Sequence, residues 1–127
     1  MSAAPVVRRA GEVPADALGP GVTVRDLLTG DRQFRVLLSE GLTITQFAGL
    51  IAPGRAPAHH YSCDEVVHVL AGEGVVHLDE AETGIGPGTS IYLPPYQPNC
   101  LENTGSVPLE LLGVFHPACS PAARHVS

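Results

Sequence analysis

Prolines and glycines are spread along the whole chain and divide it into short segments. Twelve prolines and fourteen glycines occur among 127 residues, and most lie between short runs rich in apolar and β-branched residues. No segment keeps a helical period between recognisable caps, and a proline in a helix interior would remove a hydrogen bond. The pattern predicts strands over residues 22–28, 34–38, 42–52, 59–61, 65–70, 75–79, 89–93, 99–102 and 109–115, with turns at 72–74, 82–88, 94–98 and 104–108.

Short strands spaced in this way indicate an all-β sandwich or barrel. A chain of 127 residues suits one compact domain. We expect an N-terminal arm at residues 1–21, in which Val6 and Val7 can add an edge strand. The β-barrel domain follows at 22–116, and a C-terminal tail at 117–127.

The charge of the chain limits the kinds of partner that it can bind. The formal net charge is −6, and all seven basic residues are arginines scattered along the sequence. This argues against binding nucleic acid or an anionic membrane surface, and the absence of lysine excludes Schiff-base chemistry. The partner is therefore a small molecule or a second copy of the chain. Neither a secretory signal nor a long apolar run is present, so we expect a cytoplasmic protein whose Cys63, Cys100 and Cys119 are reduced thiols.

The densest group of chemically useful side chains lies between two glycine-bearing turns, over residues 54–72. His59, His60, Tyr61 and Glu65 follow Gly54 and precede Gly72. This segment resembles the first motif of the cupin superfamily, in which a glycine is followed by His-x-His, a glutamate and a closing glycine. His59 and Glu65 match the first histidine and the glutamate, whereas Tyr61 stands in place of the second histidine.

A second segment, residues 88–105, is similar to the second cupin motif. Its run Gly88 to Asn99 is followed by Asn103-Thr104-Gly105. Here Asn99 replaces the expected histidine, and Tyr96 replaces the glycine that precedes it. Together the two motifs cover about residues 40–115. The resemblance implies a double-stranded β-helix, or jelly-roll barrel, of the small single-domain RmlC-like type, with both motifs degenerate, and it implies a homodimer.

The resemblance also implies a cavity inside the barrel. Side chains alternate along a strand, so His59 and Tyr61 share one face and His60 points to the other unless a bulge intervenes. In cupin geometry the His59 face looks into the barrel, where Glu65 and Asn99 join it. His59, Tyr61 and Glu65 are the candidate catalytic residues, and the candidate substrate-binding residues are Gln46, Arg35, Tyr92, Tyr96 and Asn99.

Two kinds of chemistry are open to this set. An imidazole and a carboxylate suit Fe(II), Mn(II), Ni(II) or Zn(II), but two good ligands are too few for tight binding. A bulge that turned His60 inward would complete a metal site with His59 and Glu65, the ligand set of a non-haem Fe(II) oxygenase.

Without a metal, a neutral histidine and a carboxyl group can move protons next to a carbonyl group. This is the chemistry of isomerases, cyclases and lyases, and we expect a biosynthetic or tailoring enzyme of this type, with a divalent metal as an optional assistant. The alternatives are the Fe(II) oxygenase and a non-catalytic ligand-binding cupin. A barrel filled by Phe47, Tyr61, Tyr92 and Tyr96, with no cavity, would favour the last of these.

Overall fold

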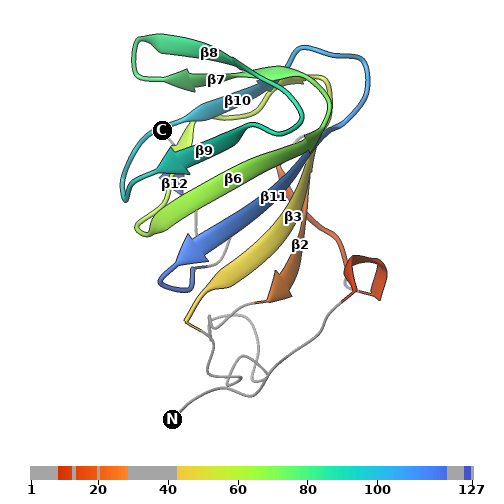
Figure 1. Cartoon of the computed structure of the whole chain (residues 1–127), viewed down its shortest axis with the longest axis vertical. Coiled ribbons are helices and arrows are strands. Elements are labelled where there is room, and N and C mark those ends of the chain that lie inside the picture. The colour runs from red at the N-terminus through yellow and green to blue at the C-terminus, as the bar shows by residue number, and fades with distance from the viewer. Residues whose placement is uncertain (1–8, 13, 20, 29–42, 120–124, 127) are drawn as a thin grey trace.

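The computed structural model describes residues 9–12, 14–19, 21–28, 43–119 and 125–126. Apart from one short 3-10 helix, its elements are strands (Figure 1). The helix is η1 (Ala10–Glu12) and the strands are β1 (Asp16–Gly19), β2 (Val22–Leu28), β3 (Thr45–Ile51), β4 (Gly54–Arg55), β5 (His59–His60), β6 (Asp64–Ala71), β7 (Gly74–Leu78), β8 (Ala81–Ile85), β9 (Ser90–Leu93), β10 (Cys100–Asn103), β11 (Leu109–His116) and β12 (His125–Val126).

The strands form two main antiparallel sheets with the hydrophobic core between them. One sheet has the order β1-β2-β3-β11-β6-β9 and the other has the order β4-β10-β7-β8, while β12 pairs with β5 separately. Sequential strands exchange between the sheets, since β6 lies in the first sheet and β7 in the second. The predicted all-β jelly roll is confirmed.

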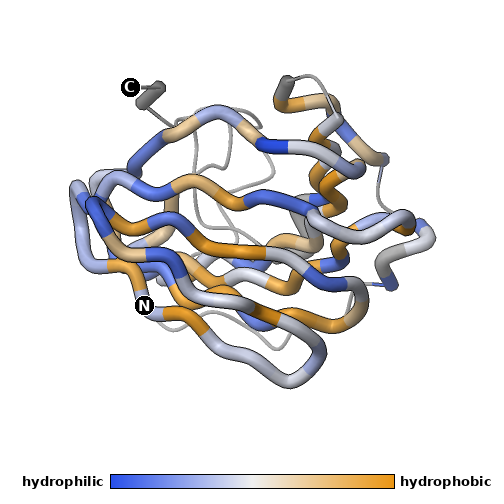
Figure 2. Tube along the Cα trace, turned by 90° about the horizontal axis from the view of Figure 1, so that it is seen from above, coloured by the Kyte–Doolittle hydropathy of each residue, from blue (hydrophilic) through white to orange (hydrophobic). Residues whose placement is uncertain are grey.

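Alternation along each strand decides which side chains enter the barrel. In β6, Glu65, Val67 and Val69 are buried, while Val66 and Leu70 are 45% and 46% exposed on the outer face. Figure 2 shows apolar stretches interrupted by polar ones along the strands of the barrel. The inward residues of several strands thus form a continuous core.

The core consists of two clusters of buried side chains. The larger one fills most of the barrel and includes Val67, Val69, Leu101 and Leu111. The smaller one lies at the end where β6 begins, and it consists of Val24, Phe47, Tyr61, Cys63 and Phe115. The rings of Phe47 and Phe115 stack there with their centroids 5.0 Å apart.

Some strands differ from the predicted ones. The segment 82–88 was expected to be a turn, but its first half belongs to β8, which pairs with β7 at the edge of its sheet. The first four residues of β8 are exposed, so the alternation that reveals a half-buried strand is missing from its sequence. The arm contributes β1, which pairs with β2. The strand predicted at 34–38 and the edge strand at Val6 and Val7 lie outside the described residues.

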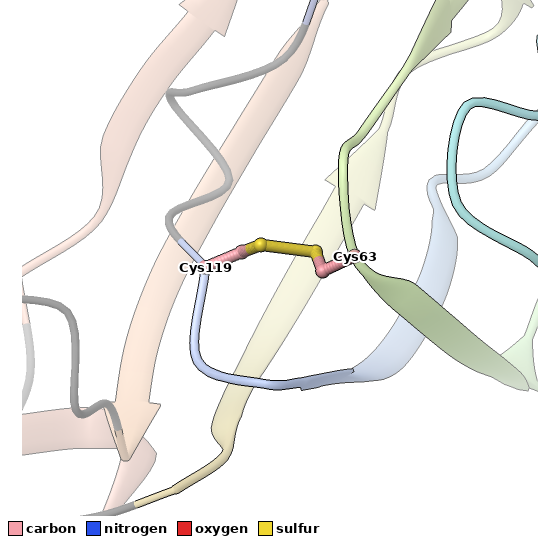
Figure 3. The surroundings of a disulfide bond; sticks show 2 residues. All are labelled: Cys63 and Cys119. Atoms are coloured by element: carbon pink, nitrogen blue, oxygen red, sulfur yellow. A yellow bond between two sulfur atoms is a disulfide. The ribbon is translucent and has the colours of Figure 1, made fainter.

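The C-terminal segment folds back against the barrel. The end of β11 pairs with the start of β6, with Phe115 opposite Glu65 and His116 opposite Asp64. The chain after β11 therefore passes the turn before β6, and Cys119 forms a disulfide with Cys63 (Figure 3). The expectation of three reduced thiols is wrong. The pairing of β11 with β6 brings Cys119 near Cys63, and the spacing of the cysteines in the sequence does not reveal that pairing. Cys100 is a buried free thiol.

Among the described residues, no helix has the length and apolar character that crossing a bilayer would require.

Candidate functional site

A small cavity lies inside the barrel, where the two core clusters meet. Its volume is about 50 Å³. Most of its wall is apolar and comes from β2, β3, β6, β9, β10 and β11, and four polar residues complete it. The lining residues are Leu18, Val22, Val24, Phe47, Gly49, Ile51, Ala56, His59, Tyr61, Glu65, Val67, Ile91, Leu93, Asn99, Leu101 and Leu111.

The four polar lining residues come from both predicted motifs. Glu65 is the second residue of β6, His59 is the first of β5, and Asn99 directly precedes β10. Tyr61 is 6% exposed, and its ring lies 5.4 Å from that of His59 in an edge-on arrangement. The structure therefore brings His59, Tyr61, Glu65 and Asn99 to one cavity.

Glu65 is buried among apolar side chains. It is 5% exposed, and its neighbours along the inner face of the barrel include Val67, Leu93 and Phe115. Burial without a compensating charge disfavours the carboxylate and raises the pKa of Glu65 from 4.5 to about 8. Near pH 7 the side chain is therefore a neutral carboxylic acid that can donate a proton.

His59 is held in one tautomer by the backbone. Its Nδ1 lies 3.0 Å from the carbonyl oxygen of Pro57. A carbonyl oxygen only accepts hydrogen bonds, so Nδ1 carries the proton that is donated. In the neutral ring, Nε2 then carries the lone pair and is the basic nitrogen. No signal in the sequence pointed to Pro57, because every residue supplies a carbonyl group.

Asn99 fixes the backbone beneath His59. The two residues exchange backbone hydrogen bonds of 2.9 Å in both directions. The Asn99 side-chain nitrogen also donates to the carbonyl oxygens of His59 and Gln97, each at 3.3 Å. Although Asn99 lines the cavity, its amide N–H groups are thus directed to backbone carbonyl oxygens, one of which is that of His59.

The other predicted substrate-binding residues do not line this cavity. Tyr92 is 60% exposed on the outer face of β9, where its hydroxyl donates to Asp64 at 2.6 Å. Tyr96 is 66% exposed in the loop before β10. Gln46 alternates with the buried Thr45 and Phe47, so it faces outward. In each case the geometry of the strand or loop places the side chain outside the barrel. Arg35 is not among the residues that the structure describes.

The third candidate metal ligand, His60, also does not line the cavity. It follows His59 directly in β5, and its ring lies 6.4 Å from that of Tyr96. No bulge turns it inward, so the strand alternation holds. Of the other histidines, His68 hydrogen-bonds Ser90 at 2.8 Å and His77 lies between Glu82 and Glu102, both away from the cavity.

The donor set of the cavity does not fit a resident divalent metal. Among the lining residues that the structure describes, the strong metal ligands are one imidazole nitrogen and one carboxyl group, too few to hold a divalent metal tightly. The Asn99 side-chain nitrogen is a donor of hydrogen bonds, not a ligand. In the part of the chain that the structure describes, no three histidine, cysteine, aspartate or glutamate side chains converge as a metal site would require.

Sequence reasoning missed the role of the arm in the cavity wall. Leu18, in β1, lines the cavity and packs against both core clusters. Prolines and glycines lie on both sides of β1, so the sequence did not indicate this strand of four residues. Phe47, Gly49 and Ile51 line the cavity from β3, and the sequence over 42–52 did not single them out, because both faces of that run carry apolar residues.

Solved structures with similar folds include several enzymes. The polyketide cyclase RemF from Streptomyces resistomycificus has a TM-score of 0.74 and 17% identity, covering 97% of this chain and 85% of that one. KdgF from Halomonas sp. has a TM-score of 0.75 and 13% identity, covering 92% and 97%. Ectoine synthase from P. lautus has a TM-score of 0.74 and 20% identity, covering 91% and 80%. At these identities the likeness concerns the fold.

Two curated proteins are similar in sequence. Auxin-binding protein 1 of Arabidopsis thaliana is 28% identical in an alignment 126 residues long, which covers 87% of this chain and 59% of that protein. The uncharacterized protein MJ1618 of Methanocaldococcus jannaschii is 38% identical over 61 residues, 48% of this chain and 49% of that protein. The chain thus spans between about half and three fifths of the length of these relatives.

The family model of the cupin domain matches residues 49–115, which is more than half of the chain and includes both motif segments. The matched range contains His59, Tyr61, Glu65 and Asn99, and the fold has the sheet order of a jelly roll. The chain is a member of the cupin domain family.

Proposed function

We propose that this protein is an enzyme that moves a proton next to a carbonyl group of a small molecule, in the range of isomerases, cyclases and lyases. The observation that carries the proposal is the buried, neutral Glu65 in the same cavity as His59. A carboxylic acid kept neutral near pH 7 can donate a proton to a carbonyl oxygen, and the Nε2 of His59 can accept one from carbon.

The reaction balances with these two residues alone. The Nε2 of His59 takes a proton from the carbon beside the carbonyl group, and the electron pair of that C–H bond forms the C=C bond of an enol. Glu65 donates its proton to the carbonyl oxygen in the same step. The imidazolium and the carboxylate that result have opposite charges and stabilise each other in an apolar site. In the reverse direction the Glu65 carboxylate takes the proton back from the enol oxygen while the imidazolium protonates carbon, which restores both groups. Protonation on the opposite face of the same carbon, or at the far carbon of a conjugated dienol, gives an isomer.

The remaining polar residues support this pair. Asn99 and Pro57 hold the backbone and the ring of His59. Tyr61 packs against His59 and against Phe115, whose ring centroid lies 4.6 Å away, so it limits the positions open to the imidazole. A substrate is therefore met by a preorganised acid and base.

The cavity favours a catalytic site over a filled scaffold. Tyr92 and Tyr96, two of the side chains that would have filled the barrel, lie outside it. Structures of similar fold include a polyketide cyclase, an ectoine synthase and an oxalate decarboxylase, so proteins with this fold include enzymes, which supports a catalytic role.

Deuterium exchange tests the proposal directly. Purified protein is incubated in D2O with a set of small enolisable ketones, and loss of the proton signal next to the carbonyl group is followed by NMR. We expect exchange above the buffer rate with the wild type. His59→Ala and Glu65→Ala should each reduce the rate by about 100-fold or more, the usual contribution of a general acid or base.

Matched controls separate catalysis from folding. His68→Ala and Glu110→Ala remove a histidine and a glutamate from positions outside the cavity, and both should retain the wild-type rate. Thermal unfolding of each variant shows that it is folded. Exchange at the buffer rate with wild-type protein and every ketone would contradict the proposed function, as would full activity in either alanine variant at the site.

A further inference from the structure

The cavity wall separates into an apolar part and a polar part. Of the sixteen lining residues within the described ranges, twelve are apolar and four are polar. Glu65 lies opposite Phe115 near the start of β6, whereas Val69, four residues further, lies opposite Leu111. Four residues of strand span about 13 Å, so the polar groups occupy one end and the far end is lined by side chains such as Ile51, Leu101 and Leu111.

Among the described lining residues there is no arginine. Arg25 contributes to a different depression, on the outer face beside Ala48 and Glu110. The Nε of Arg55 donates to the Sγ of Cys100 at 3.2 Å, and Arg55 itself is exposed. An anion that entered the cavity would lose its hydration without gaining a guanidinium partner from the described part of the wall, which is costly in an apolar environment.

The volume of the cavity sets an upper size for what enters it. At about 50 Å³ it has room for roughly three to five water molecules. A compact aliphatic molecule with one polar end is compatible with both the volume of the cavity and its mostly apolar wall. A molecule with polar groups at both ends would leave one of them unpaired against Ile51 or Leu111.

We infer that the substrate is an uncharged, compact aliphatic carbonyl compound of at most about six non-hydrogen atoms, bound with its oxygen at the His59 and Glu65 end and its carbon atoms toward Leu111. The inference rests on the proposed function for the identity of the site, and it adds charge, size and orientation. It follows from the composition and placement of the lining residues.

Three compounds of the same shape test the charge. They are 3-methylbutan-2-one, isobutyramide and isobutyrate, which have the same carbon branch and differ in the group attached to the carbonyl carbon. Binding is followed at pH 6.5 by chemical-shift changes of the protein in a titration. We expect the ketone and the amide to bind at least about tenfold more tightly than the carboxylate, because only the anion must be desolvated without a cation. Equal or tighter binding of isobutyrate overturns the inference, and so does the absence of binding by all three.

Two neighbouring valines show whether binding occurs in the cavity. Val67 lines the cavity, whereas Val66 is exposed on the opposite face of the same strand. Val67→Leu adds one methylene group inside and should weaken binding of the ketone by about threefold or more, whereas Val66→Leu should leave it unchanged. Equal effects of the two substitutions would place binding elsewhere and overturn the inference.

Glu65→Gln separates the inference from the proposed function. The amide retains a hydrogen-bond donor but loses the acidic proton, so the neutral ketone should bind within about threefold of the wild type while its deuterium exchange is lost. Exchange that survives in Glu65→Gln contradicts the proposed function alone. If deuterium exchange is lost in Glu65→Gln but isobutyrate binds more tightly than the ketone, the proposed function stands and only the substrate class is contradicted.

Discussion

His59 and Asn99 exchange two backbone hydrogen bonds of 2.9 Å each and so join the two motif segments of the barrel. The pair is isolated, since no longer ladder continues from it, and the side chain of Asn99 reinforces it with hydrogen bonds to the carbonyl oxygens of His59 and Gln97. Asn99, which replaces the expected histidine of the second motif, thus hydrogen-bonds the backbone of His59, the histidine of the first motif.

The Asn99 side chain can be tested by an isosteric change. Asn99→Asp keeps the shape but removes both side-chain N–H donors, so the carbonyl oxygens of His59 and Gln97 each lose one hydrogen bond, and a carboxylate is buried at a 3% exposed position. The carbonyl oxygen of His59 keeps its hydrogen bond from the backbone N–H of Asn99. We expect a loss of about 1 to 3 kcal/mol in the free energy of unfolding at pH 7, measured in urea, and a smaller loss for Asn99→Ala. An Asn99→Asp variant as stable as the wild type would show that these hydrogen bonds do not hold the segment.

Burial of Glu65 predicts how stability depends on pH. The pKa of Glu65 is about 8 in the folded protein and 4.5 when the side chain is solvated, so the folded state holds one more proton than the unfolded state between these values. The stability that comes from this neutral group is full below about pH 4.5 and is lost as the pH rises toward 8, by at most about 1.4 kcal/mol per pH unit. Above pH 8 both states are ionised at this position and the loss stops.

Glu65→Gln provides the reference for that prediction, because glutamine does not titrate. The unfolding free energy of Glu65→Gln minus that of the wild type should rise from pH 5 to pH 8, because only the wild type loses stability over this range. Above pH 8 the difference should remain constant. The exchange rate of the wild type should fall above about pH 8, as the acid loses its proton. A constant difference across the whole range would mean that Glu65 is not held neutral by burial.

The fold class could be predicted from local patterns, because glycine and proline mark most of the turns between short strands. Strand alternation places His59 and Tyr61 on one face, whereas the expectation that Glu65 and Asn99 join them came from the resemblance to the cupin motifs, and all four line one cavity. The sequence could not place Tyr92 and Tyr96, because whether a side chain at a strand or loop faces the barrel depends on the register between strands. The disulfide was missed for the same reason, since only the pairing of β11 with β6 brings Cys119 to Cys63.

The close packing of Phe47 on Gly113 predicts a specific sensitivity. A Cβ at position 113 would overlap the ring of Phe47, whereas one at Gly84 in β8 meets nothing within 4 Å. We expect Gly113→Ala to lower the free energy of unfolding by about 1 to 3 kcal/mol through overpacking. The matched Gly84→Ala should change stability by less than about 0.5 kcal/mol. Because Phe47 lines the cavity, Gly113→Ala should also weaken binding of 3-methylbutan-2-one, and equal stability of the two variants would contradict this packing.

The donor set of the cavity predicts little affinity for divalent metals. Protein purified without chelator should carry less than about one tenth of an equivalent of iron, manganese, nickel or zinc by elemental analysis. Its unfolding temperature should not change on addition of EDTA or of Zn(II) at twice the protein concentration. A stoichiometric metal that is lost in His59→Ala would contradict the conclusion that the cavity does not bind a divalent metal. Such a metal would require a further ligand from residues that the structure does not describe.

The disulfide between Cys63 and Cys119 links residues 56 positions apart and ties the segment after β11 to the turn two residues before Glu65. Closing a loop of this length lowers the entropy of the unfolded chain and is worth up to about 4 kcal/mol. We expect Cys63→Ser and Cys119→Ser each to lower stability by about 2 to 4 kcal/mol, and the double variant to lose no more than the larger single loss, because one bond is removed in all three. Thiol titration of the denatured, unreduced wild type should find one free cysteine, Cys100. Three free thiols, or losses that add in the double variant, would show that the bond does not form.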